Sequence, residues 1–259
     1  MIVQANKLAV RMWAKHLNKP TPVNLALHAY WNLGGHNSGD IFSHTIQLFG
    51  SEVTPVDEEL IPTGEIVNVK DTPYDSLQAR EIGSMFNQLP DGYDINYVLD
   101  DLNPGHFKKV AVVQESVSGR KSELWTNQPG LQFYTSNMLD NVKGKGGCVY
   151  AKHAGICLET QGLPDAVNHP YFPSQIVDPG EIYQNIMIFR FTAHQSFSGY
   201  PARFPVKRMK RKIEFTRVIV IDTESYTYTG RLQLIPTSQN QLLHCSFSSD
   251  ILGITMESE

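Results

Sequence analysis

The sequence has few cysteines. Only three occur among its 259 residues. They are Cys148, Cys157 and Cys245, an odd and sparse set without metal-ligand spacing. A disulfide scaffold and a metal site are therefore not expected. Because disulfides are rare where glutathione keeps thiols reduced, this usage favours a cytoplasmic protein.

Long apolar runs and a strong excess of one charge are also missing. No segment approaches the roughly 18 consecutive apolar residues of a membrane-spanning helix. Gln4, Asn6, Lys7 and Arg11 interrupt the first residues, which argues against a signal peptide. The formal net charge of -4 is mild. We therefore expect neither a membrane nor a nucleic acid as partner.

Alternation of apolar and polar residues with a period of two dominates the chain, which is typical of half-buried β-strands. The alternating segments are 7–15, 44–49, 93–99, 109–114, 131–135, 155–161 and 183–191. Clusters of Pro, Gly, Asn and Asp separate them, and there is no internal repeat. Many short strands with polar turns predict an all-β sandwich.

One segment departs from this alternation. Asp75 and Gln78 have the spacing of a capping box. Leu77, Ile82 and Phe86 would form the buried stripe of a helix that begins there. We therefore expect one short helix after Asp75.

The chain changes character at about Ser196. A loop-like stretch leads into the basic cluster Lys207, Arg208, Lys210, Arg211 and Lys212, and alternating segments follow at 213–222 and 226–235. Such a cluster can mark a nuclear-import or polyanion-binding patch. We interpret it as a solvated surface run, which is the commoner origin of clustered charge.

Three of the predicted strands contain a polar residue of interest, namely Asp94, Gln132 and Glu159. The alternation places apolar side chains on one face of each strand and these polar side chains on the other. Singly, each is more often an ordinary surface residue. A carboxylate in a strand as apolar as 155–161 must be hydrogen-bonded or solvated, because a bare buried charge is costly. We expect all three to project from one side of a sheet.

His28 lies among aromatic and amide residues, close to Tyr30 and Trp31. One interpretation is a hydrogen-bonded core histidine. The other is a general acid or base, because imidazole is the side chain whose ordinary pKa lies near neutrality. Neighbouring aromatic rings would suit a sugar, whose C–H face stacks on them while its hydroxyls bind fixed polar groups. This feature alone leaves both interpretations open.

Four motifs, taken together, resemble those of the aldose 1-epimerase (galactose mutarotase) family, and they occur in that family's order. They are NLALHAYWNL at 24–33, GYDINYVL at 92–99, QPGLQFYTSN at 128–137 and GICLETQGLPDAVN at 155–168. The sequences of these motifs are close to those of the family's plant members. The resemblance covers roughly residues 8–195.

The resemblance implies a large antiparallel β-sandwich that uses no metal or organic cofactor. It implies interconversion of the α and β anomers of free aldohexoses such as galactose and glucose, by acid/base-catalysed ring opening and closure. Glu159 matches the family's general base and His28 its general acid. Asp94 and Gln132 match ligands of the sugar hydroxyls, and Tyr30 lies in the histidine motif and would line the pocket.

Two departures from the family set further expectations. Residues 1–195 would form an aldose 1-epimerase domain that is incomplete at its N-terminus, because the family's upstream strands have no counterpart here. Residues 196–259 would be a C-terminal extension outside the match. A catalytically weak carbohydrate-binding remnant of the same fold is therefore the alternative. An epimerase of hexose 6-phosphates is less favoured, because residues 1–195 contain no arginine cluster for a phosphate.

Overall fold

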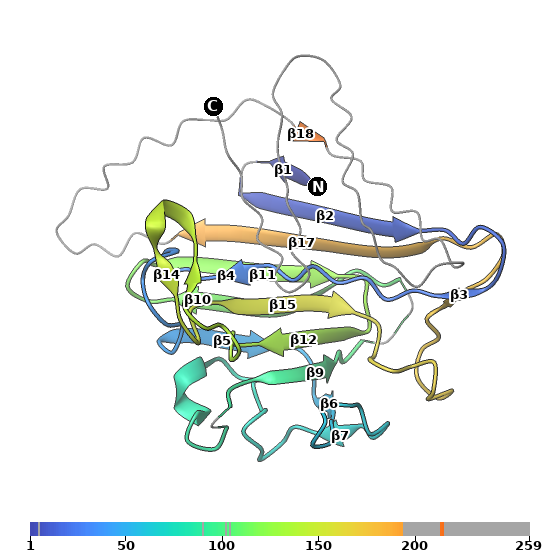
Figure 1. Ribbon diagram of the computed structural model, residues 1–259, viewed down its shortest axis with the longest axis horizontal. Coiled ribbons are helices and arrows are strands. Elements are labelled where there is room, and N and C mark those ends of the chain that lie inside the picture. The colour runs from blue at the N-terminus through green and yellow to red at the C-terminus, as the bar shows by residue number, and fades with distance from the viewer. Residues whose placement is uncertain (5, 90, 102, 104, 194–212, 215–259) are drawn as a thin grey trace.

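Two antiparallel sheets pack face to face in a β-sandwich (Figure 1). The structure, a computed structural model, describes residues 1–4, 6–89, 91–101, 103, 105–193 and 213–214. Within these residues the larger sheet has eight strands and the smaller sheet has six. The all-β sandwich and the antiparallel arrangement expected from the sequence are confirmed.

The larger sheet has the order β18 (Ile213–Glu214), β1 (Ile2–Gln4), β2 (Lys7–Ala14), β17 (Tyr183–Ala193), β11 (Arg120–Thr126), β10 (Lys108–Glu115), β5 (His44–Leu48) and β8 (Arg80–Glu81). The smaller sheet has the order β4 (Tyr30–Trp31), β15 (Ile156–Gln161), β12 (Gly130–Tyr134), β9 (Asp94–Val98), β6 (Glu52–Thr54) and β7 (Val67–Asn68). Two further pairs are β13 (Val142–Lys143) with β14 (Val149–Tyr150) and β16 (Ile176–Val177) with β3 (Thr21–Pro22).

The core lies between the two sheets and explains the alternation in the sequence. Leu131 and Phe133 of β12 are fully buried, as are Met187 and Phe189 of β17, and all four belong to one apolar cluster. Successive side chains of a strand point to opposite faces, so the intervening residues leave this core. The seven alternating segments coincide with β2, β5, β9, β10, β12, β15 and β17.

The predicted helix after Asp75 is wrong. The carboxylate of Asp75 accepts a bond from the backbone N–H of Leu77 at 3.2 Å and closes a local turn instead. Arg80 then pairs with Ile46 of β5 in the larger sheet, which fixes the backbone in an extended form. Within this segment only Ile82–Met85 forms a short 3-10 turn, with Ile82 fully buried; a second 3-10 turn lies at Lys145–Gly147. Sheet pairing and core burial therefore outweigh the local capping signal.

The predictions for the C-terminal part lie almost wholly outside the described residues. This holds for the basic cluster at 207–212, the segment 226–235 and most of 213–222; only 213–214 are described, as β18 paired with β1. In the part of the chain that the structure describes, no helix combines the length and apolar character needed to cross a membrane.

Candidate active site

The outer face of the smaller sheet carries a row of polar side chains. Gln132 in β12 stands directly opposite Glu159 in β15 and Asn96 in β9. Tyr134, which is the next residue of β12 on the same face as Gln132, stands directly opposite Cys157 in β15 and Asp94 in β9. Directly paired residues share a face of a sheet, so Asp94, Gln132 and Glu159 all project from the side opposite the core. The structure thus brings together the three strand residues singled out in the sequence.

The turn before β9 places Asp94 at the start of its strand. Gly92 has a φ of 75°, a conformation that side chains disfavour. A Cβ atom there would also collide with the side chains of Thr135 and Asn137. Glycine is therefore required for the chain to enter β9 beside β12.

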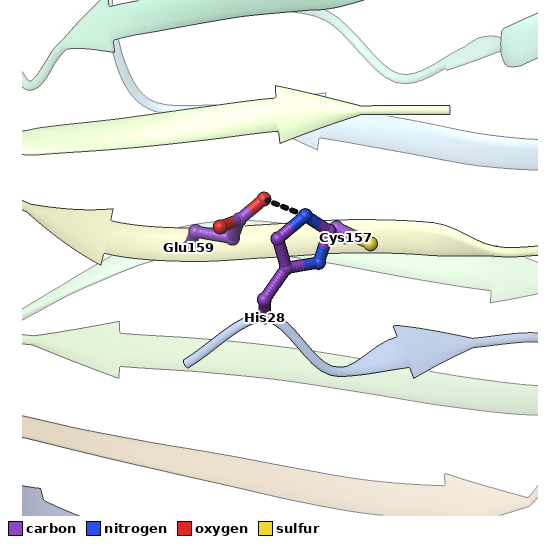
Figure 2. A group of neighbouring side chains, drawn as sticks. All are labelled: His28, Cys157 and Glu159. Carbon is purple, nitrogen blue, oxygen red and sulfur yellow. Dashed lines mark ion pairs between the residues drawn. The ribbon is translucent and has the colours of Figure 1, made fainter. Parts of the chain in front are cut away.

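His28 reaches the same face from the irregular segment between β3 and β4. Its ring stacks on Tyr30 with centroids 5.0 Å apart and meets the edge of Tyr134 at 5.8 Å. Figure 2 shows the imidazole turned toward Glu159, with Nε2 at 3.6 Å from the carboxylate Oε1. The side chain of His28 is 37% exposed and that of Glu159 only 11%. A solute can therefore approach the pair from the side of the histidine.

The environment reverses the usual order of the two pKa values, so that the pKa of Glu159 lies above that of His28. Burial, and then the charge of Asp94, raise the pKa of Glu159 to about 8. Burial lowers the pKa of His28, against the raising effects of its own backbone and of Asp94. At neutral pH the pair therefore holds one proton, which resides on Glu159 while His28 is neutral.

Asp94 and Gln132 form a fixed polar pair next to this proton. Gln132 Nε2 donates to Asp94 Oδ1 at 2.7 Å. Burial raises the pKa of Asp94, whereas the bond from Gln132 and the nearby His28 lower it. The amide thus holds the carboxylate of Asp94 in place on the face that His28 overhangs.

Two residues of this face had no role in the sequence-based hypothesis. The ring of Tyr134 packs against His28 and Tyr30, and its hydroxyl accepts a bond from the Met138 N–H at 2.9 Å. Cys157 is fully buried beside Tyr30 in the register of β15 and β4. The sequence could have indicated Tyr134 and Cys157 only through their spacing of two residues from Gln132 and Glu159, because residues i and i+2 of a strand share a face.

His28, Cys157 and Glu159 are also the residues that could hold a metal ion, since their donor atoms all lie within 4.8 Å of one another (Figure 2). A thiol binds metals as the thiolate. Burial, with Glu159 and Asp94 nearby, raises the pKa of Cys157 far above its usual range. Glu159 also carries a proton at neutral pH. The group is therefore better suited to proton exchange than to metal binding.

A separate hollow of about 440 Å³ lies away from this group. It is lined by Asp71, Thr72, Asp75, Gln78, Ala79, Arg80, Met85 and Gln88. The guanidinium of Arg80 donates to the backbone carbonyl of Asp75 within it. Its lining shares no residue with the His28 group, so the hollow and the His28–Glu159 pair are separate features of the molecule.

Solved structures share this fold. A GalM/aldose epimerase homologue from C. elegans superposes with a TM-score of 0.65 at 25% identity, covering 73% of this chain and 57% of that one. A galactose 1-epimerase from Lactobacillus acidophilus superposes with a TM-score of 0.58 at 23% identity, covering 73% and 54%. The fold is therefore the β-sandwich of the galactose mutarotase type, with His28 beside Glu159 on the outer face of its smaller sheet.

Sequence comparison gives the family. The family model for aldose 1-epimerase matches residues 1–190. Galactose mutarotase from Homo sapiens is 45% identical over 177 residues, which cover 68% of this chain and 51% of that protein. Aldose 1-epimerase from Escherichia coli (strain K12) is 36% identical over 185 residues, covering 68% and 53%. The chain belongs to the aldose 1-epimerase family, and it spans about half the length of these relatives.

Proposed function

We propose that this chain interconverts the α and β anomers of free aldohexoses such as galactose and glucose. Glu159 acts as the general base and His28 as the general acid. The proposal depends above all on the 3.6 Å approach of imidazole and carboxyl, with the pKa of Glu159 raised to about 8. It is supported by membership of a family whose relatives are named galactose mutarotase and aldose 1-epimerase.

The reaction needs two groups that exchange protons in opposite directions. Glu159 removes the proton from the C1 hydroxyl while His28 protonates the ring oxygen, and the C1–O5 bond breaks. The aldehyde turns about C1–C2, and the ring closes from the other face as both groups reverse their roles. A positioned acid or base typically contributes about 10²–10⁴-fold to such a rate.

Sugar binding must first redistribute the proton of the pair. In the free site that proton is on Glu159, whereas the reaction begins with a carboxylate and an imidazolium. A C1 hydroxyl that donates to Glu159 and a ring oxygen that accepts from His28 would stabilise this charged arrangement. The charge of Asp94 favours the imidazolium of His28, whose pKa it raises, although it also raises the pKa of Glu159.

The remaining residues would bind the sugar. Asp94 and Gln132 present fixed acceptor and donor groups to its hydroxyls, and Tyr30 presents a ring beside His28. No metal or organic cofactor takes part in the proposed reaction. We further assign residues 1–195 to the epimerase domain and 196–259 to an extension, since the family match ends at residue 190. The free thiols of Cys148 and Cys157 favour the cytoplasm.

Polarimetry tests the proposal. The purified chain, with a cooperative thermal melt as the check on folding, is mixed with freshly dissolved α-galactose or α-glucose. The optical rotation should relax faster than in buffer, at a rate proportional to protein concentration. No acceleration by folded protein would reject the proposal, and sugar binding without acceleration would identify the carbohydrate-binding alternative.

A further inference from the structure

Asn185 is a fully buried polar residue in β17, on the sheet that does not carry the proposed active site. Its side-chain Nδ2 donates to the backbone carbonyls of Leu25 at 2.8 Å and Thr160 at 2.6 Å. Its Oδ1 accepts a bond from the hydroxyl of Thr160 at 3.0 Å. Both the nitrogen and the oxygen of this amide are thus bonded to two other parts of the chain.

Those two parts carry the proposed acid and base. Leu25 belongs to the irregular segment between β3 and β4, three residues before His28. Thr160 follows Glu159 in β15. Figure 1 shows the segment running from β3 back to β4 between β17 and β15, so Asn185 joins it to β15 from the opposite sheet.

The other side-chain bonds to this segment are longer or involve an exposed residue. The Tyr183 hydroxyl accepts from the Leu25 N–H at 3.2 Å and donates to the Leu25 carbonyl at 3.3 Å. The Asn24 amide pairs with the backbone of Gly162 at 2.8 and 3.2 Å, but Asn24 is exposed. Water competes for exposed hydrogen bonds, whereas a buried group that loses its partner stays unpaired. Asn185 is therefore the principal tie between the two segments.

We propose that Asn185 is a positioning residue that fixes the imidazole of His28 at its working distance from the carboxyl group of Glu159. This inference rests on the proposed function. Catalytic groups lose about 10²-fold in rate when they are misplaced by about 1 Å. A segment without strand pairing between β3 and β4 can move by that amount once its buried tie is removed.

The test compares Asn185→Leu with Val113→Ala. Leucine fills a similar volume without the amide, and Val113 is a buried core residue of β10 outside the proposed site. Asn185→Leu should lower kcat for anomer exchange by about 10–100-fold while KM changes little. The alkaline limb of the kcat/KM profile should move to lower pH, because Glu159 becomes more hydrated. Val113→Ala should lower Tm and leave the limbs in place.

An NMR titration of the His28 imidazole supplies a readout that does not depend on activity. Its pKa should return toward the ordinary value in Asn185→Leu and stay lowered in Val113→Ala. If the wild type has no mutarotase activity, the proposed function fails and this titration still decides the role of Asn185. An unchanged kcat, unchanged limbs or an unchanged His28 pKa in Asn185→Leu would overturn the inference. Should that variant not fold, Tyr183→Phe removes the phenol contacts with Leu25 and Asn185 and should give a smaller shift in the same direction.

Discussion

The imidazole of His28 faces the carboxyl group of Glu159 at 3.6 Å, although the two residues lie far apart in the sequence. One comes from an irregular segment beside the edge strand β4, and the other from β15, the strand that pairs with it. Burial raises the pKa of Glu159 and lowers that of His28. The pair can therefore shift one proton between its members near neutral pH, and the predictions below follow from this relationship.

The substitution Glu159→Gln should nearly abolish the reaction. Glutamine keeps the size of the side chain but cannot take up a proton, so kcat should fall by about 10²–10⁴-fold. Polarimetry with the folded variant measures this loss. A variant that keeps a tenth or more of the wild-type rate would mean that another group is the base.

Glu159 should also make the wild-type protein less stable at alkaline pH. Its pKa is raised from 4.5 to about 8, so folding favours the neutral form. This contribution is complete below pH 4.5 and is lost as the pH rises through 8. Glu159→Gln should therefore match the wild type near pH 4.5 and exceed it at alkaline pH by roughly 5 kcal/mol at most.

Urea unfolding of both proteins at the two pH extremes measures this difference. The stability of the wild type relative to the variant should decline steadily as the pH rises from 4.5 to 8. A gap that does not change with pH would show that Glu159 has an ordinary pKa in the folded protein.

Asp94→Asn should shift the whole pH profile. The wild-type kcat/KM should be bell-shaped, with an acid limb below 6.5 from His28 and an alkaline limb near 8 from Glu159. The charge of Asp94 raises both pKa values, so its removal should move both limbs to lower pH. KM should rise as well, because a proposed sugar ligand is lost.

A distant carboxylate provides the control for this substitution. Glu123 in β11 is buried and paired with Arg190 in β17, on the larger sheet. Glu123→Gln removes the same charge and should leave both limbs where they are. Limbs that stay fixed in Asp94→Asn, or that move equally in both variants, would contradict the assigned role of Asp94.

Cys157→Ser should leave kcat within about threefold of the wild type. Burial raises the pKa of this thiol, which disfavours the thiolate that a nucleophile or a metal ligand needs. For the same reason a chelator such as EDTA should not alter the rate. Inactivation by EDTA that added zinc reverses would instead assign the His28, Cys157 and Glu159 group to a metal.

The strands were predictable because alternation is a local property of the sequence. The segment 183–191 corresponds to β17 and 155–161 to β15, since each must place every second side chain in the core. The helix expected after Asp75 failed because Arg80 pairs with Ile46, a contact between distant parts of the chain. Sheet order is equally non-local, and no local pattern in the sequence defined it.

The proposed site, like the fold, was predictable from the sequence only in part. Alternation placed Asp94, Gln132 and Glu159 on the outer faces of their strands, and the motifs indicated His28. The distance between His28 and Glu159 depends instead on an irregular segment, and no periodicity describes such a segment. Asn185 escaped notice because its significance lies in bonds to Leu25 and Thr160, which only the packing of the two sheets creates.

Two-dimensional exchange NMR on an equilibrated sugar is the most direct test of anomer exchange by His28 and Glu159. At equilibrium the exchange peaks between α- and β-galactose report the interconversion itself, without any net reaction. If these two residues catalyse it, exchange should increase in proportion to the concentration of the chain and disappear in Glu159→Gln and His28→Ala. Exchange equal to that in buffer with folded wild-type protein, or exchange that survives in both variants, would contradict it.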